Sequence, residues 1–349
     1  MLAVAAFLEQ GRLGPPAGRL ERAAVRALGK WLGRTVVRRL SLPAGVPVVC
    51  IGGATLGGSG KTPLAIACAA ALARAFPGRR VALVGHAYRA APRRARIVRP
   101  DDPVEEVGDE ALVAVQALAS LPPDASARAS VVVAPTRQGA IDHAARAADV
   151  LVLDGVTQTA PARAALALLA VDAAEPWGRA VAVPPWGDLR APVPELLRSV
   201  DRVVALGDGD VKGAWSARVV TPGARLGHEI LVWEALRPLR VGLVCALARP
   251  ERVLRRLACQ GVFPSVVLRT RDHGPGARAH GEGPPPGPRV DLWLATSKCA
   301  QHVAKFGFCR PLAVLEHSVE LPADVVAALT AVGGGNTLET SRNVSQKAE

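Results

Sequence analysis

A glycine-rich turn between an apolar run and a helical run constrains this chain more than any other feature. Residues 46–52 are apolar and rich in β-branched side chains, which predicts a buried strand. Residues 57–62 read Gly-Gly-Ser-Gly-Lys-Thr, and the Ala-rich residues 63–68 predict a helix. A strand, a glycine loop, Lys-Thr and a helix in this order predict a P-loop, the turn that holds the phosphates of a nucleoside triphosphate.

The residue types of the turn explain this chemistry. Glycines let backbone N–H groups turn inward around phosphate oxygens, and the N-terminus of the following helix adds positive potential. Lys61 can reach the β- and γ-phosphates, and the Thr62 hydroxyl can bind Mg²⁺. The usual pattern begins with Gly, whereas this chain has Thr55 there. The residues expected to bind the nucleotide are Thr55, Gly57, Gly58, Ser59, Gly60, Lys61 and Thr62.

A second apolar run ends on an acidic residue. Residues 150–153 are apolar and are followed by Asp154, the pattern of a buried parallel strand that carries a metal-binding carboxylate at its end. Residues 81–84 and 131–134 predict further buried strands, which alternate with Ala-rich helices. This alternation predicts a doubly wound, mostly parallel α/β sheet with Asp154 as a candidate Mg²⁺ ligand.

Length and composition limit the classes of protein to which the chain can belong. The 349 residues suffice for two domains, and the six cysteines form no CxxC pair, which argues against a disulfide framework and a zinc site. The net charge is +13, and residues 1–49 carry eight Arg or Lys against two Glu. A basic end suggests an anionic partner. The sequence has no interleaved aromatic and basic residues that would indicate nucleic-acid binding, so we expect none.

Residues 19–40 predict a basic amphipathic helix. Leu20, Leu28, Leu32 and Leu40 belong to an apolar series that recurs every four residues, and Arg or Lys residues follow the same spacing on the opposite face. Such a helix, with Trp31 at its edge, suits an anionic membrane surface. The alternative is a helix that packs on the protein with its charged face in water. Residues 1–8 are too short an apolar run to cross a bilayer.

Taken together, the segment after residue 46 resembles the tetraacyldisaccharide 4′-kinases, also called lipid A 4′-kinases. Their loop reads T-V-G-G-T-G-K-T-P, so it also has Thr where other P-loops have Gly, and here residues 55–63 read T-L-G-G-S-G-K-T-P. Further segments resemble the family's in the same order. These are residues 107–112, 131–137, 154–158, 185–192, 245–252 and 295–300, together with Asp272 and His273.

The resemblance implies ATP-dependent phosphorylation of the 4′-hydroxyl of a tetraacyl disaccharide 1-phosphate, a lipid A precursor, at the cytoplasmic face of the bacterial inner membrane. It implies two α/β domains with the site between them, and we expect a monomer. Asp109 would activate the sugar hydroxyl, with His273 as its partner. Thr62 and Asp154 would hold Mg²⁺ with support from Glu110, and Arg137 and Arg190 would bind phosphate groups. The domains expected are residues 1–45, a basic membrane-surface helix; 46–205, a P-loop kinase domain; 206–332, a smaller α/β domain; and 333–349, a tail.

The chain departs from the family pattern at several acidic positions. Gly155 replaces the second Asp of the D-D-G motif, and Ala191 replaces the Glu that follows Arg190. Ser297 and Cys299 replace the acidic residues of the T-E-K-D-A motif. These changes leave an alternative open, a degenerate relative that binds ATP in a regulatory or scaffold role. Lys61, Thr62, Asp109, Asp154 and His273 are retained and favour activity.

Overall fold

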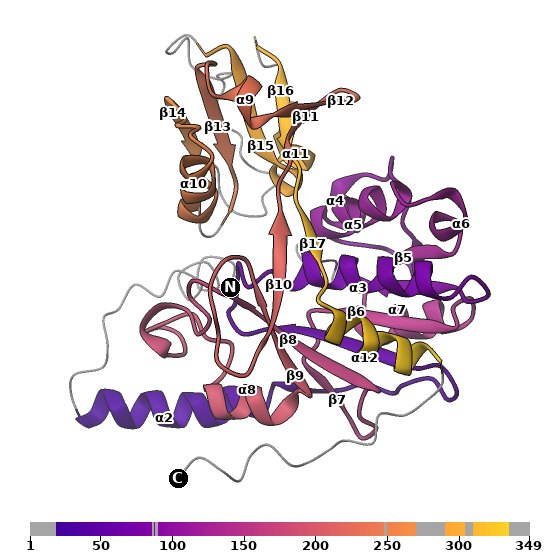
Figure 1. Cartoon of the computed structure of the whole chain (residues 1–349). Coiled ribbons are helices and arrows are strands. Elements are labelled where there is room, and N and C mark those ends of the chain that lie inside the picture. Colours follow the sequence, from indigo (N-terminus) through magenta and orange to yellow (C-terminus); the bar gives the residue numbers. More distant parts are fainter. Residues whose placement is uncertain are drawn as a thin grey trace.

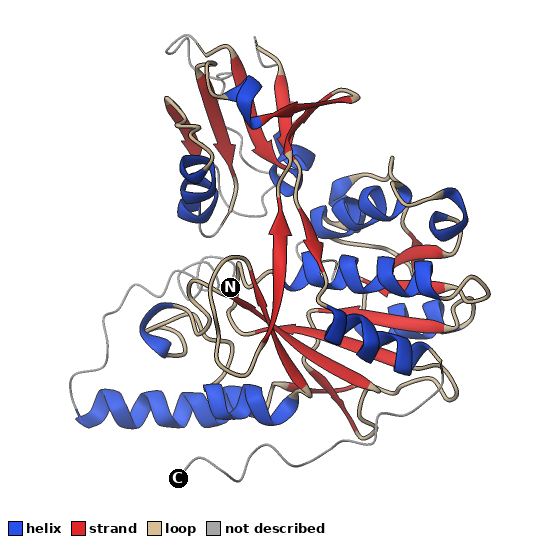
Figure 2. Ribbon diagram, viewed as in Figure 1, coloured by secondary structure: helices blue, strands red, loops and turns tan. Residues whose placement is uncertain are grey.

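The computed structural model describes residues 19–85, 87, 90–247, 250–269, 290–303 and 310–334. A nine-stranded sheet and a six-stranded sheet form two lobes that are joined by neighbouring strands (Figures 1 and 2). The nine-stranded sheet has the order β17-β10-β9-β8-β2-β6-β3-β5-β4. Its strands are β2 (Val48–Gly53), β3 (Val81–Val84), β4 (Arg96–Ile97), β5 (Ala129–Val133), β6 (Val150–Asp154), β8 (Leu166–Asp172), β9 (Arg202–Leu206), β10 (Trp215–Val220) and β17 (Ser318–Glu320).

This larger sheet is parallel from β10 to β5, with antiparallel strands at both edges. Every residue of β2, β3 and β6 is buried, as expected for parallel strands covered by helices on both faces. The helices of this part are α3 (Lys61–Ala75), α4 (Val104–Val107), α5 (Asp109–Ala119), α6 (Pro123–Ser126), α7 (Arg137–Ala145), α8 (Val193–Ser199), α12 (Ala323–Gly333) and the 3-10 turn η1 (Arg179–Val181). The predicted doubly wound, mostly parallel sheet is confirmed.

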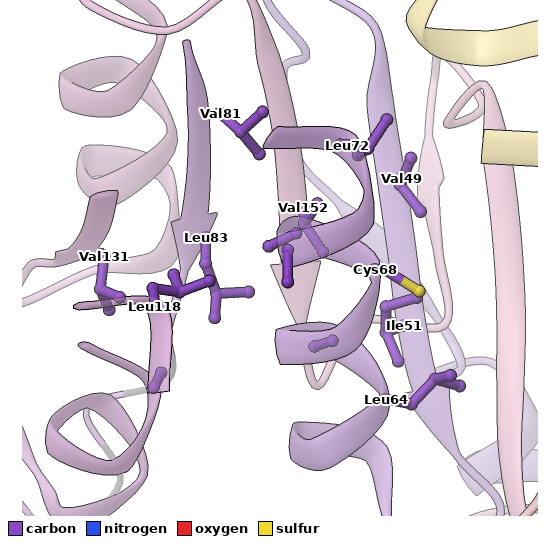
Figure 3. Packing of buried hydrophobic residues seen from close by; sticks show 14 of the residues in the cluster. Val49, Ile51, Leu64, Cys68, Leu72, Val81, Leu83, Leu118, Val131 and Val152 are labelled. Carbon is purple, nitrogen blue, oxygen red and sulfur yellow. The ribbon is translucent and has the colours of Figure 1, made fainter. Parts of the chain in front are cut away.

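Helix α3 packs across the centre of the larger sheet. Its Leu64, Cys68 and Leu72 lie against Val49 and Ile51 of β2 (Figure 3). All five side chains are at most 1% exposed. Because α3 begins at Lys61, this apolar contact also holds the P-loop at the end of β2.

The smaller sheet has the order β12-β11-β16-β15-β13-β14. Its strands are β11 (Gly223–Leu226), β12 (Glu229–Val232), β13 (Val241–Cys245), β14 (Val266–Arg269), β15 (Leu292–Thr296) and β16 (Leu312–Leu315), accompanied by α9 (Trp233–Leu236), α10 (Pro250–Cys259) and α11 (Ser297–Val303). The elements of residues 206–332 therefore divide between the two lobes. Strands β10 and β17 pair in the larger sheet, and α12 packs against α3.

The N-terminal segment differs from the predicted helix in its extent. Helix α2 (Arg19–Gly33) ends seven residues early, and β1 (Val37–Arg39) pairs in parallel with β7 (Gln158–Ala160). Gly33 and the β-branched residues after it favour an end to the helix there. Leu28 and Leu32 pack against the apolar cluster that contains Leu196 of α8. For this part of α2 the apolar positions therefore face the protein, whereas Trp31 is 59% exposed.

None of the helices in the described ranges has the length and apolar character that a bilayer span requires.

We expect Gly52→Ala in β2 to destabilise the protein. A Cβ atom at Gly52 would lie 2.6 Å from Oγ1 and 2.8 Å from Cα of Thr157, so backbone would have to move. Overpacking of this kind costs about 1–3 kcal/mol, and the midpoint of thermal unfolding should fall accordingly. Gly78→Ala is the matched control because a Cβ there meets nothing within 4 Å. Equal midpoints for the two variants would contradict the expectation.

Candidate active site

The P-loop connects β2 to α3 at the carboxyl end of the parallel strands, where ligands bind in open α/β sheets. Gly58 has φ +72° and Gly60 has φ +82°, backbone conformations that favour glycine. The Thr55 hydroxyl donates a 2.7 Å hydrogen bond to the carbonyl of Gly57, and Thr55 is 2% exposed. Thr55, which distinguishes this loop from other P-loops, therefore stabilises the loop through a hydrogen bond within it.

Two ionic contacts connect the start of α3 to neighbouring elements. Lys61 Nζ lies 3.2 Å from Glu110 Oε1 and 3.9 Å from Asp154 Oδ1. The Thr62 hydroxyl donates a 2.7 Å hydrogen bond to Asp154 Oδ2. The structure thus brings Glu110 and Asp154, which are distant in the sequence, to the adjacent Lys61 and Thr62.

Asp154 is a buried carboxylate with one oxygen that makes no hydrogen bond. Asp154 is 2% exposed, and its Oδ1 atom has no hydrogen-bond partner. Burial raises the pKa of Asp154, the Lys61 charge lowers it, and the Glu110 charge raises it. A hydroxyl beside a carboxylate with a free oxygen fits Mg²⁺, which prefers hard oxygen ligands and binds with one or two carboxylates plus substrate phosphates.

Asp109 opens α5 beneath the second lobe. Its Oδ1 accepts the backbone N–H of Glu110 at 2.7 Å, and its Oδ2 lies 2.9 Å from Nε2 of His302. His302 belongs to α11, so this contact crosses from one lobe to the other. Lys298, also on α11, lies 3.5 Å from Glu110 Oε1. The sequence analysis gave neither residue a role. Lys298 lies in the segment that resembles T-E-K-D-A, whereas His302 lies outside the matched segments.

The two predicted arginines donate hydrogen bonds to backbone carbonyls at the ends of β3 and β2. Arg137 Nη1 donates hydrogen bonds to the carbonyls of Val84 and Gly85, each at 3.3 Å. Burial is the main cause that lowers the pKa of Arg137, and the charge of Asp154 raises it. Arg190 Nε donates to the carbonyl of Gly53 at 3.3 Å, beside the start of the loop. His273, expected to partner Asp109, lies outside the described residues.

A third arginine, which the sequence analysis did not select, reaches the P-loop from the second lobe. Arg252 of α10 lies 2.8 Å from Asp172 Oδ2 at the end of β8. It also donates a hydrogen bond to the carbonyl of Gly58. The P-loop is therefore in contact with both lobes.

The residues that depart from the family pattern differ in their surroundings. Ala191 is fully buried in an apolar cluster, and Gly155 has φ +78°. Cys299 Sγ accepts the backbone N–H of Ala246 at 3.1 Å. A hydrogen bond from Cys245 is the main cause that lowers the pKa of Cys299 to about 6, whereas burial raises it. The hydrogen bond from Cys245 thus favours the thiolate of Cys299 more than in an ordinary cysteine.

Comparisons with known proteins find sequence similarity to one family. Residues 16–282 match the model of a family described as tetraacyldisaccharide-1-P 4′-kinase. A tetraacyldisaccharide 4′-kinase of Allorhizobium ampelinum is 32% identical over 282 residues, which cover 76% of each chain. One from Nitrobacter winogradskyi is 31% identical over 269 residues, 74% of this chain and 76% of that protein.

The fold is similar to the crystal structure of the "apo" form of LpxK from Aquifex aeolicus in complex with ATP. The TM-score is 0.61 with 20% sequence identity, and the match covers 89% of this chain and 95% of that chain. At this identity the likeness shows the fold alone.

We expect Asp154→Asn to stabilise the protein without ligands at neutral pH. Folding raises the pKa of this carboxyl above its unfolded value of about 3.9. Its stabilising effect is therefore present below that value and is lost as the pH rises through the folded pKa. At pH 7 the raised pKa of Asp154 costs folding free energy, because the carboxyl is ionised in the unfolded chain, and the neutral amide removes that cost. Thermal unfolding midpoints at pH 4 and pH 7 measure the change.

Asp149→Asn is the control for this prediction. Asp149 directly precedes β6, and a side-chain hydrogen bond from Arg80 is the main cause that lowers its pKa. Removal of its charge should leave the midpoint at pH 7 unchanged or lower. A midpoint for Asp154→Asn that does not exceed the wild-type value would contradict the argument.

Proposed function

The chain belongs to the tetraacyldisaccharide-1-P 4′-kinase family, and from this premise we propose that it transfers the γ-phosphoryl group of ATP to the 4′-hydroxyl of a tetraacyl disaccharide 1-phosphate, a step of lipid A biosynthesis. One observation carries the proposal. The Lys61 and Thr62 pair of the P-loop and the buried Asp154 lie together, and Glu110 connects Lys61 to the helix that begins with Asp109. The alternative of a regulatory or scaffold role is not favoured.

In the proposed reaction Asp109 accepts the proton of the 4′-hydroxyl. The hydroxyl oxygen forms a bond to the γ-phosphorus, the bond from that phosphorus to the bridging oxygen breaks, and ADP leaves with that oxygen. Phosphoryl transfer depends mainly on positioning and on charge stabilisation. Asp109 suits the role of base because its carboxylate is held in place on both oxygens by contacts from α5 and α11.

Lys61 and the arginines would offset phosphate charge. Lys61 is paired with Glu110, so incoming phosphates would compete with that carboxylate for its ammonium group. Thr62 and Asp154 would hold Mg²⁺, whose charge supports the same oxygens, with Glu110 as a nearby carboxylate. Arg137 and Arg190 donate hydrogen bonds to carbonyls at the ends of β3 and β2 and would bind phosphate groups of ATP or of the lipid.

We also propose that the protein associates with the membrane surface peripherally and acts as a monomer at the cytoplasmic face. Trp31, Lys30 and Arg34 of the α2 region are exposed, a combination that suits an anionic interface.

The kinase assignment is tested by product formation. Purified protein is incubated with radiolabelled Mg-ATP and the tetraacyl disaccharide 1-phosphate, and a bis-phosphorylated product is expected. Lys61→Ala should lower the rate about a hundredfold or more, as expected for loss of a group that stabilises transition-state charge. Chelation of Mg²⁺ should abolish the product. Wild-type turnover equal to that of Lys61→Ala would exclude the kinase function.

Asp109→Asn separates the role of the base from nucleotide binding. A general base contributes about 10²- to 10⁴-fold, so kcat should fall by that range. The KM for ATP should stay unchanged because Lys61 and Thr62 remain. Full activity of this variant would remove the role from Asp109 and leave the kinase assignment standing.

Membrane association is tested by sedimentation with vesicles. Wild-type protein should sediment with vesicles that contain anionic lipid and remain in solution with zwitterionic ones. Trp31→Ala combined with Lys30→Glu should weaken this binding, since each basic residue near an anionic surface contributes about 1 kcal/mol. Ile97→Ala combined with Arg94→Glu, changes at another surface, is the control. Equal binding of both double variants would contradict the role of α2.

A further inference from the structure

Helix α10 brings an arginine from the smaller lobe to the P-loop. The helix belongs to that lobe (Figure 1), because its Leu257 is 1% exposed and packs in the apolar cluster of the smaller sheet. Arg252 of the same helix contacts the larger lobe at two places. Its Nη1 donates a hydrogen bond to the carbonyl of Gly58, and its Nη2 lies 2.8 Å from Asp172 Oδ2. One guanidinium group therefore connects the P-loop and the end of β8 to the smaller lobe.

Asp172 is held in place where β8 ends. Its Oδ1 accepts the backbone N–H of Ala174 at 2.9 Å, and its Oδ2 faces Arg252. The Arg252 and Asp172 side chains are only 21% and 20% exposed, and Glu175 Oε2 lies 3.9 Å from the same Arg252 nitrogen. Because a guanidinium is planar and rigid, a carboxylate that fixes one of its nitrogens also directs the other. Asp172 therefore aims Nη1 of Arg252 at the P-loop.

The carbonyl that Arg252 contacts belongs to the peptide unit between Gly58 and Ser59. A trans peptide unit is planar, and its C=O and N–H groups point in opposite directions. A donor on the Gly58 carbonyl therefore also fixes the direction of the Ser59 N–H, a group of the kind that a P-loop offers to phosphate oxygens. The preceding carbonyl, of Gly57, already accepts the Thr55 hydroxyl. Side-chain donors thus hold two successive carbonyls of a glycine-rich turn that would otherwise rotate freely.

We propose that Arg252 is a positioning residue for the nucleotide, which holds the P-loop in the shape that binds the triphosphate of Mg-ATP. This inference rests on the nucleotide-binding part of the proposed function. Arg252 acts through the Gly58 peptide unit, and Asp172 acts through Arg252. Because α10 belongs to the smaller lobe, the affinity for ATP depends on the contact between the lobes.

The effect of Arg252 falls on binding because the loop is ordered before ATP arrives. Ordering a flexible turn costs conformational entropy, and a turn that is already ordered spares the complex that cost. The same backbone N–H groups hold the phosphates in the bound substrate and during transfer. Loss of the contact should therefore raise the KM for ATP more than it lowers kcat.

Arg252→Met tests this role, since methionine has an unbranched side chain without N–H donors. Titration calorimetry of the full chain with Mg-ATP, without lipid, should show a Kd about tenfold or more above that of the wild type, as expected for loss of a charged donor. Arg255→Met is the matched control. It removes the same charge from an exposed position of the same helix and should bind Mg-ATP as the wild type does. Arg252→Lys keeps the charge but lacks the planar fork, so its loss should be smaller than that of Arg252→Met.

Turnover and a double variant separate positioning from a merely structural role. With the tetraacyl disaccharide 1-phosphate as acceptor, Arg252→Met should raise the KM for ATP and leave the KM for the lipid unchanged. Asp172→Ala should weaken Mg-ATP binding, and adding it to Arg252→Met should weaken binding no further, because the shared effect is already lost. Thermal midpoints report whether each variant is folded.

Several results would overturn the inference. Equal Kd values for Arg252→Met and the wild type would remove the role, and tighter binding would identify the contact as one that ATP must displace. Equal loss in Arg255→Met, or full affinity in Arg252→Lys, would assign the effect to charge alone. Full additivity of Arg252→Met with Asp172→Ala would separate the two side chains, and a fall in the thermal midpoint and kcat with an unchanged Kd would leave only a structural role.

The binding measurement also keeps this inference distinct from the kinase assignment. A wild-type protein that binds Mg-ATP, shows the Arg252 effect and forms no bis-phosphorylated product would reject the kinase function and support the role of Arg252. A wild-type protein that does not bind Mg-ATP would reject both.

Discussion

The hydrogen bond from the Thr62 hydroxyl to Asp154 joins the P-loop to the neighbouring strand, and the rest of the site is arranged around it. It exists because β2 and β6 are adjacent parallel strands, so their carboxyl ends meet at one edge of the sheet. The apolar packing of α3 on this sheet keeps Thr62 in place. The carboxylate is left buried, with one oxygen free of hydrogen bonds and a raised pKa. The fold thus buries a carboxyl whose ionised form is disfavoured at the point where a cation would stabilise it.

The second lobe completes the site from outside the larger sheet. It reaches the P-loop through Arg252 and the start of α5 through Lys298 and His302. Its own sheet supports α10 and α11, the helices that carry these side chains. Strands β10 and β17 connect the lobes, and α12 then returns to pack on α3. Contacts from two separately built sheets therefore meet on the residues that surround the phosphate-binding turn.

The missing acidic residues have different consequences at different positions. Ala191 is enclosed in an apolar cluster, where a carboxylate would be buried without compensation. Gly155 has a left-handed backbone and lies beside Arg137, so this position contributes backbone geometry in place of charge. At Cys299 a hydrogen bond from Cys245 lowers the pKa of the thiol. The three positions therefore differ in what stands in place of the family's carboxylate.

The local pattern of the sequence was sufficient for the P-loop, the parallel sheet and the choice of Asp154. Strands that are buried on both faces are continuously apolar, and a glycine turn followed by Lys-Thr is typical of a P-loop. Both patterns lie within short segments of the sequence. The N-terminal helix was predicted too long, because the four-residue spacing continues through β1, where pairing with β7 decides the conformation. Asp109 was selected only through the family resemblance. Its contact with His302 joins residues 193 positions apart, and no local pattern in the sequence encodes it. The sequence by itself determined which groups we propose to bind phosphate, because they lie in one short segment, while the packing of two lobes decided which side chains contact the proposed base.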